Sequence, residues 1–239
     1  MIHKKLSKYL LKLYFKIFVK FSKKFSRENL YNYLEESIEK YIFQNREFDI
    51  GKLNIINVGA GGEISKTIKK KLKKFVEIDI DAKRSPDLIL DIQNVYLIKN
   101  NSIDVVFCFE VLEHVKNTFK AVKEIKRILK PEGIFIGSTP FIFPIPDEPH
   151  DYFRYTKYGI LNLFNKFEVL ELKERNSYTK SLYVLLLRLL NTGTTKQRII
   201  GIMLFPFMLL LCPFVLLFNK LITNRQATTG YFYVLKKPY

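Results

Sequence analysis

From residue 53 onward, short apolar segments of strand length alternate with longer segments of helical periodicity, and this alternation restricts the fold more than any other feature of the sequence. The apolar segments are Leu53–Val58, Phe75–Ile80, Asp87–Leu90, Ile103–Phe109 and Ile134–Ser138. Segments such as Lys116–Leu129 have the spacing of helices between them. Strands that are apolar on both faces need a layer of helices on each side. The pattern therefore predicts a doubly wound α/β fold with a mostly parallel sheet.

A glycine-rich turn, with Gly59, Gly61 and Gly62 around Ala60, follows the first apolar segment. Glycines at a strand-to-helix turn let the backbone approach a ligand closely and leave helix N-terminal N–H groups free to bind a negative group. A dinucleotide-binding fingerprint needs a further glycine at position 64, where this chain has Ile64. The turn alone is a weak signal, because tight turns often have this spacing.

Acidic residues follow the next two strands. Asp79 ends the second strand, 20 residues after Gly59, where a carboxylate can accept two hydrogen bonds from ribose hydroxyls. Asp91 and Ile92 follow the third strand, in a position suited to an adenine amino group and to contact with its ring. The fourth strand then leads into residues 109–115, FEVLEHV.

Together with residues 124–133, EIKRILKPEG, this ordered set resembles the class I S-adenosylmethionine-dependent methyltransferases over residues 50–175, in particular a type 11-like branch associated with bacterial surface glycans. The resemblance implies a Rossmann-like sheet of seven strands with an antiparallel last strand, S-adenosyl-L-methionine as cofactor, and no metal. It implies that the cofactor is bound by Gly59, Ala60, Gly61, Asp79, Asp91, Ile92 and Glu110. Two positions depart from the family pattern, with Asn57 in place of the usual acid and Glu63 in place of the usual third glycine.

The segment after the fifth strand, Thr139–Thr156, is expected to contact the methyl acceptor, because open α/β sheets bind ligands at this edge. Its residues 148–154, EPHDYFR, resemble methyltransferases of bacterial surface-glycan and lipid-linked saccharide pathways. His150, oriented by Asp151, has the chemistry of a general base, and Arg154 could pair with a phosphate on the acceptor. Alternatively, these side chains form a hydrogen-bonded lid that only shapes the pocket. His114 is expected to have a structural role.

Residues 1–27 have lysines at positions 4, 8, 12, 16, 20 and 24, with aliphatic and aromatic residues between them. This spacing predicts a basic amphipathic helix that lies on an anionic membrane surface. The alternative is a helix packed on its own domain, with the lysines in solvent. The formal charge of +17 on the whole chain also implies an anionic partner, which composition alone does not identify.

A second long apolar segment, Ile199–Phe218, contains twenty residues without a charge, which is long enough to cross a bilayer. A single crossing would separate the expected sixth and seventh strands, Phe167–Leu172 and Gly230–Leu235, which pair in this fold. Pro206 and Pro213 are expected to interrupt a helix here. We therefore expect residues 178–222 to form a hydrophobic insertion whose two arms enter and leave one leaflet. A buried cap or a dimer interface is the alternative.

Residues 28–239 are thus predicted to form a methyltransferase domain at the cytoplasmic face of the cell membrane. The expected reaction is O-methylation of a surface-glycan or lipid-linked saccharide, or of another small-molecule acceptor. The alternatives are C-methylation of a quinone-type lipid and a non-catalytic membrane adaptor. A nucleic-acid substrate is disfavoured because no [DN]-P-P-[YF] motif occurs, and the spacing of Cys108 and Cys212 gives no support for a zinc site.

Overall fold

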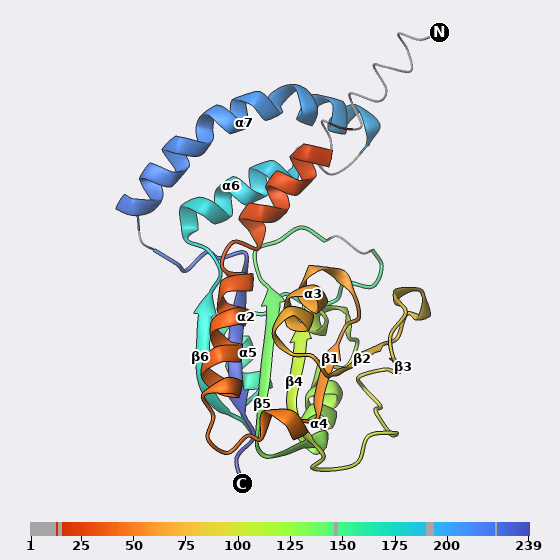
Figure 1. The fold of residues 1–239 in the computed structure, drawn as a ribbon. Helices are drawn as coiled ribbons and strands as arrows, with labels where there is room; N and C mark the ends of the chain where they lie inside the picture. The colour runs from red at the N-terminus through yellow and green to blue at the C-terminus, as the bar shows by residue number, and fades with distance from the viewer. Residues whose placement is uncertain (1–12, 14–15, 146–147, 190–193, 223) are drawn as a thin grey trace. The chain divides into compact units, whose positions relative to one another are not determined.

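The computed structural model describes residues 13, 16–145, 148–189, 194–222 and 224–239. Seven strands form one sheet in the order β3-β2-β1-β4-β5-β7-β6 (Figure 1). They are β1 (Ile55–Val58), β2 (Val76–Asp79), β3 (Leu88–Ile89), β4 (Ile103–Phe109), β5 (Leu129–Pro140), β6 (Glu168–Glu174) and β7 (Gly230–Lys236). Strands β1 to β5 run parallel, and β7 runs antiparallel to β5. The predicted seven-stranded, mostly parallel sheet with an antiparallel last strand is confirmed, as is the pairing of the sixth strand with the seventh.

Helices cover both faces of this sheet, because consecutive strand residues point to opposite sides. Val105 and Phe107 of β4 share one core cluster with α2 and α3, whereas Val106 and Cys108 share the other with α4 and α5. These helices are α2 (Leu30–Ile38), α3 (Gly62–Lys71), α4 (Thr118–Ile128) and α5 (Lys157–Leu163). Short π- and 3-10 turns are η1 (Glu39–Phe43), η2 (Ile50–Lys52), η3 (Ala82–Arg84) and η4 (Leu112–His114).

The chain folds as two compact units. The first, which we call the sheet unit, comprises residues 29–141, 145–173 and 230–239. The second, which we call the helical unit, comprises residues 1–28, 142–144 and 174–229. Its helices in the described part of the chain are residues 16–26, α6 (Tyr178–Leu189) and α7 (Thr195–Leu221). The N-terminal segment and the insertion expected at 178–222 therefore belong to one unit.

Aromatic side chains hold the three helices of the helical unit together. The ring centroid of Phe18 lies 4.6 Å from that of Phe205 in α7, and the centroid of Phe25 lies 5.1 Å from that of Tyr183 in α6. Phe21 packs against the same cluster. The spacing of the N-terminal lysines predicted that the aromatic side of this helix lies in a membrane interface. In its described residues this side packs on α6 and α7, where tilted and edge-to-face aromatic rings bury a large apolar area.

Helix α7 runs for 27 residues through both Pro206 and Pro213. The expectation that these prolines interrupt the helix is therefore wrong. Each proline removes one backbone donor, but the surrounding leucines and other apolar residues favour the helix, and Thr194 with Gln197 forms a capping box at its start. Residues Ile199–Leu221 are long and apolar enough to cross a membrane by length and composition.

Candidate active site

The glycine turn between β1 and α3 is packed on one side and open on the other. Gly59, Gly61 and Gly62 have φ angles of 91°, 80° and 72°, in a region that strains residues with a side chain. A Cβ atom on Gly59 would lie 2.7 Å from Cγ2 of Val111, which lies between β4 and η4. Cβ atoms on Gly61 and Gly62 would meet no heavy atom within 4 Å. The exposed backbone at these two positions is therefore accessible to a ligand. Helix α3 begins at Gly62 despite the departure at Glu63.

Asp79 lies beside this turn, at the carboxyl end of β2. Its Oδ2 accepts a hydrogen bond from the Ala60 N–H at 2.8 Å, and its Oδ1 accepts one from the Asp81 N–H at 2.9 Å. Each carboxylate oxygen has a second lone pair, so the side chain retains capacity for two hydroxyl donors. The structure thus brings together Gly59, Ala60, Gly61 and Asp79, which the sequence assigned to the same ligand.

Asp91 and Ile92 follow β3 and are less available than the sequence suggested. The Asp91 Oδ1 accepts from the Gln93 N–H at 2.8 Å, and its Oδ2 accepts from Nε2 of Gln93 at 3.0 Å. Ile92 is 5% exposed and belongs to the hydrophobic core. An adenine amino group at Asp91 would therefore compete with the Gln93 amide, and Ile92 offers little surface for a ring contact.

Glu110 occupies a strained position directly after β4. Its φ angle of 54° is unusual for a residue with a side chain, and such residues cluster at ligand sites. Its Oε1 accepts a hydrogen bond from Oγ of Ser138 in β5 at 2.8 Å. The chain changes direction across the sheet between β1 and β4, and open α/β sheets bind ligands at this switch point. Glu110 and the glycine turn both lie at the carboxyl edge there.

Glu77 is a part of this site that sequence reasoning missed. It is 7% exposed, and its Oε1 accepts from Nδ2 of Asn57 at 3.3 Å and from the Gly61 N–H at 3.4 Å. Burial raises the pKa of Glu77, but hydrogen bonds from Ser65, Lys69 and Gly61 outweigh burial and hold the pKa below its usual value. The Glu77 carboxylate of β2 thus contacts both the turn, at Gly61, and Asn57. Asn57 is the position where methyltransferases of this kind usually have an acid. Glu77 lies two residues before Asp79, and the alternation of side chains along a strand could have indicated that both point to the turn.

Replacing Glu77 with glutamine is expected to lower the free energy of unfolding by about 1–2 kcal/mol near neutral pH, because charge-assisted hydrogen bonds to the turn are lost. Since the folded-state pKa of Glu77 is lowered, its contribution exists above the usual glutamate pKa and disappears as the pH falls through the folded-state pKa. Denaturant unfolding of both proteins over a pH series measures this difference. The control is Glu63→Gln, whose exposed carboxylate pairs with Lys66 and should change stability by less than about 0.5 kcal/mol. A Glu77→Gln difference that persists undiminished at acid pH would contradict this role.

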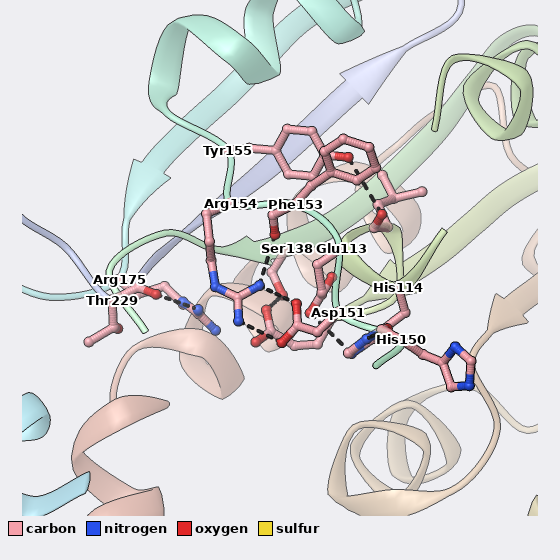
Figure 2. Close-up of polar contacts among 12 residues, drawn as sticks. Glu113, His114, Ser138, His150, Asp151, Phe153, Arg154, Tyr155, Arg175 and Thr229 are labelled. Atoms are coloured by element: carbon pink, nitrogen blue, oxygen red, sulfur yellow. Dashed lines mark hydrogen bonds and ion pairs between the residues drawn. The ribbon is translucent and has the colours of Figure 1, made fainter. Parts of the chain in front are cut away.

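The loop after β5 contains a partly buried ion pair that differs from the predicted arrangement. The Asp151 carboxylate accepts hydrogen bonds from both terminal nitrogens of Arg154, and Figure 2 shows the two groups facing each other. The Asp151 side chain is 0% exposed. Contact with Asp151 raises the pKa of Arg154 above its usual value, and the nearby Glu113 and Glu110 add to this.

Two predictions about this loop therefore need correction. Asp151 does not orient His150, because its carboxylate is engaged by the geometrically matched guanidinium of Arg154. Arg154 is likewise not a free cation for an acceptor phosphate, because Asp151 already neutralises it. Pro146 and Asp147 of the same predicted loop lie outside the described residues.

His150 is exposed and is held through two other contacts. Its Nδ1 lies 3.1 Å from the Tyr152 hydroxyl oxygen, and its carbonyl oxygen lies 2.6 Å from Nδ1 of His114. The Tyr152 N–H donates to the Glu113 carbonyl oxygen at 2.8 Å, which joins the loop to the segment after β4. The loop that contains His150 is thus fixed to the same edge of the sheet as Glu110.

These groups fit the cofactor that the resemblance implies. The open, positive-φ backbone at Gly61 and Gly62 can accept a charged methionine end, and Asp79 has lone pairs for a ribose diol. Within the described part of the chain, no group of three His, Cys, Asp or Glu side chains is placed to hold a metal ion.

A family model and individual relatives both identify this chain as similar to methyltransferases. Residues 56–137 match the model of a family described as a methyltransferase domain. The "Ubiquinone biosynthesis O-methyltransferase" of Rickettsia typhi is 30% identical over 158 residues, which cover 52% of this chain and 64% of that protein. The protein of the same name from Rickettsia prowazekii is 30% identical over 177 residues, which cover 59% of this chain and 68% of that protein. The chain thus spans just under two thirds of the first of these relatives and slightly more of the second.

Solved structures share the fold at low sequence identity. A putative sarcosine dimethylglycine methyltransferase from Galdieria sulphuraria has a TM-score of 0.58 and 13% identity, with 88% of this chain and 86% of that chain covered. An S-adenosylmethionine-dependent methyltransferase from Clostridium acetobutylicum has a TM-score of 0.54 and 10% identity, with 93% and 100% covered. At such identities the likeness establishes the fold alone.

Proposed function

Because this chain belongs to the class I S-adenosylmethionine-dependent methyltransferases, we propose that it methylates a ring hydroxyl of a quinone-type lipid. The observation that carries the choice of acceptor is that relatives at about 30% identity are named as O-methyltransferases of ubiquinone biosynthesis. The long apolar helix α7 also suits a lipid-soluble acceptor. The glycan-associated branch and glycan acceptor expected from the sequence gain no support from these relatives.

The cofactor, when bound, supplies the methyl group of its sulfonium for in-line transfer to the acceptor oxygen. The glycine turn and Asp79 hold the donor in position, and alignment of the reacting atoms supplies much of the rate. The acceptor hydroxyl must lose its proton as the new oxygen–carbon bond forms. We assign this proton to Nε2 of His150.

This assignment requires one tautomer of His150. In it, Nδ1–H donates to the Tyr152 hydroxyl oxygen across the observed 3.1 Å, and Nε2 carries the lone pair that accepts the proton. Tyr152 is then a positioning residue for His150, in the place that the sequence gave to Asp151. The Asp151–Arg154 pair links two positions of the same loop.

The acceptor class can be tested with three compounds and methyl-labelled cofactor. These are a dihydroxylated aromatic ring with an alkyl tail, the same ring without the tail, and a lipid-linked saccharide. We expect a methyl ether on the tailed ring, with kcat/KM at least about tenfold above the tailless ring, because each buried CH₂ contributes about 0.8 kcal/mol. Mass spectrometry locates the methyl group. Transfer to the saccharide alone, or to a ring carbon, would overturn the proposal.

A further inference from the structure

Helix α7 packs within the helical unit through one narrow stripe. Phe205 and Val215 are buried, and Met208 and Cys212 pack on the same cluster. These residues are three or four positions apart, so they lie along a single line of the helix surface. Only 17% of the most apolar window of this helix is buried.

The remaining circumference of α7 is apolar and exposed. Thirteen large apolar side chains of α7 are exposed, among them Met203 at 69%, Phe207 at 63% and Leu210 at 69%. Leu182, Leu186 and Leu189 of α6 are exposed as well. They line an apolar groove of about 550 Å³ with Leu185 and Pro144. Soluble proteins rarely expose continuous apolar surfaces of this kind unless a partner covers them.

The charge of the chain is concentrated in this same unit. Its residues include 16 lysines and arginines but only two acids, Glu28 and Glu174, whereas the sheet unit has 24 lysines and arginines and 21 acids. The helical unit therefore carries +14 of the formal +17. Lys16, Lys20, Lys23 and Lys24 are exposed on the helix of residues 16–26. A second copy of so basic a surface would be repelled, whereas an anionic bilayer satisfies both the charge and the apolar surface.

Chain length restricts how this unit can enter a bilayer. Eight residues separate the end of α7 from the start of β7, so the nine Cα–Cα steps from Leu221 to Gly230 span at most about 32 Å when fully extended. Because β7 lies beside β6 in one sheet, a crossing by α7 would force these linking residues back across a hydrocarbon core about 30 Å thick. They could do so only as a fully extended chain, whose backbone N–H and C=O groups would have no partners in lipid. Helix α6 has 12 residues and is about 18 Å long, too short for a second crossing. The chain must therefore enter and leave on the same side.

We propose that the helical unit inserts into one leaflet of an anionic bilayer, with the exposed side of α7 among the acyl chains and the lysines of residues 16–26 at the headgroups. The apolar contact gives a salt-insensitive component of binding, and the lysines give a component that salt screens. This inference concerns where the protein works, and it does not depend on which hydroxyl is methylated.

Co-sedimentation of the full chain with vesicles separates the two components. The vesicles are phosphatidylcholine, either pure or with about one third phosphatidylglycerol, at low salt and at about 0.5 M NaCl. Wild type should bind the anionic vesicles at both salt concentrations. Met203→Gln with Phe207→Gln and Leu210→Gln should bind at low salt but weaken by about 10²-fold or more at high salt, because large apolar side chains no longer enter the acyl region. Glutamine preserves helix propensity, and circular dichroism checks the fold.

A second variant tests the salt-sensitive component of membrane binding. Lys16→Gln, Lys20→Gln, Lys23→Gln and Lys24→Gln together should weaken low-salt binding to anionic vesicles by about 10²-fold and reduce its salt dependence. Its matched control replaces Lys70, Lys71, Lys73 and Lys74, which are exposed in the sheet unit, with glutamine. The control for the α7 variant replaces Tyr96, Leu97 and Phe119 of the sheet unit with glutamine. These three side chains are 71%, 60% and 63% exposed. Both controls should bind as wild type does.

Three results would overturn the proposal. Wild type that stays in the supernatant with anionic vesicles would remove the bilayer as the partner. Sedimentation equilibrium that finds a dimer, converted to a monomer by the α7 variant with no loss of vesicle binding, would assign the surface to a second copy. Cysteines introduced at Lys196 and Lys220 that react with an impermeant reagent from opposite sides of the vesicle would assign α7 to a crossing.

Discussion

Replacing His150 with alanine is expected to lower kcat by about 10²–10⁴-fold, the range for loss of a general base. The His150 imidazole is exposed on the loop that contacts with Glu113 and His114 fix to the segment after β4, and its Nδ1 lies 3.1 Å from the Tyr152 hydroxyl oxygen. Because His150 has no described contact with the glycine turn or Asp79, cofactor affinity should remain within a few-fold of wild type. Steady-state kinetics with a productive acceptor and calorimetry with the cofactor measure the two quantities.

A positioning role for Tyr152 gives this test a second arm. Tyr152→Phe removes the hydroxyl that orients His150 but leaves the base, so its loss of kcat should be smaller than that of His150→Ala, and the double variant should lose little more than His150→Ala alone. Tyr158→Phe, on the exposed side of α5, controls for the loss of a phenol and should keep full activity. Turnover of His150→Ala within a few-fold of wild type would leave these side chains the role of a lid.

Replacing Asp79 with alanine is expected to weaken binding of S-adenosylmethionine by about 2–4 kcal/mol, because two hydrogen bonds from the ribose to a charged acceptor are lost. The same substitution removes the acceptor of the Ala60 N–H, which donates to Asp79 Oδ2 at 2.8 Å. A change in the conformation of the glycine turn should therefore add to the loss of affinity. Titration calorimetry with S-adenosylmethionine and S-adenosylhomocysteine gives the affinities.

Asp81→Ala is the matched control for this prediction. Asp81 is exposed two residues further along the same loop, and its carboxylate caps η3 through the Lys83 N–H. It should leave cofactor affinity unchanged. Asp79→Asn, which keeps the size and one acceptor oxygen, should fall between wild type and Asp79→Ala. Equal affinity in wild type and Asp79→Ala would contradict the assignment of the ribose to Asp79, and wild type that binds neither ligand would contradict the cofactor site as a whole.

The residues predicted to hold the cofactor could be grouped from the sequence because they follow strand ends in a fixed order. Gly59, Asp79 and Glu110 each come directly after or at the end of an apolar segment, and parallel strands bring such ends to one edge. Glu77, which supports that edge, was not predicted, although alternation along β2 places its side chain on the same side as that of Asp79. Glu77 lies inside a strand, and its contact with Asn57 and Gly61 depends on the parallel register of β1 and β2, which pairs Asn57 with Glu77.

The loop expected to contact the acceptor was predicted less well than the residues expected to hold the cofactor. Residues 148–154 were predicted to act on the acceptor or to form a hydrogen-bonded lid, and the expected contact between Asp151 and His150 is replaced by a pair between Asp151 and Arg154. Asp151 is adjacent to His150 in the sequence, yet its carboxylate lies on Arg154, three residues away, because the loop turns back on itself and a planar guanidinium matches both oxygens of the acid. Adjacent residues in an irregular loop point in directions that no periodicity determines.

Periodicity and composition by themselves determined the doubly wound sheet, its strand segments, the cofactor edge and the presence of a basic and a highly apolar segment. These depend on local spacing and on residue type, which the sequence states directly. The tertiary structure alone decided that residues 16–26 pack their phenylalanines on α6 and α7, that α7 continues through two prolines, and that its apolar side is left exposed. Packing of residues 16–26 on α6 and α7 joins segments about 150 or more residues apart, which local spacing does not reveal. Continuation of α7 through its prolines depends on whether the apolar helix outweighs the backbone hydrogen bonds that the prolines remove. Only the folded chain shows both outcomes.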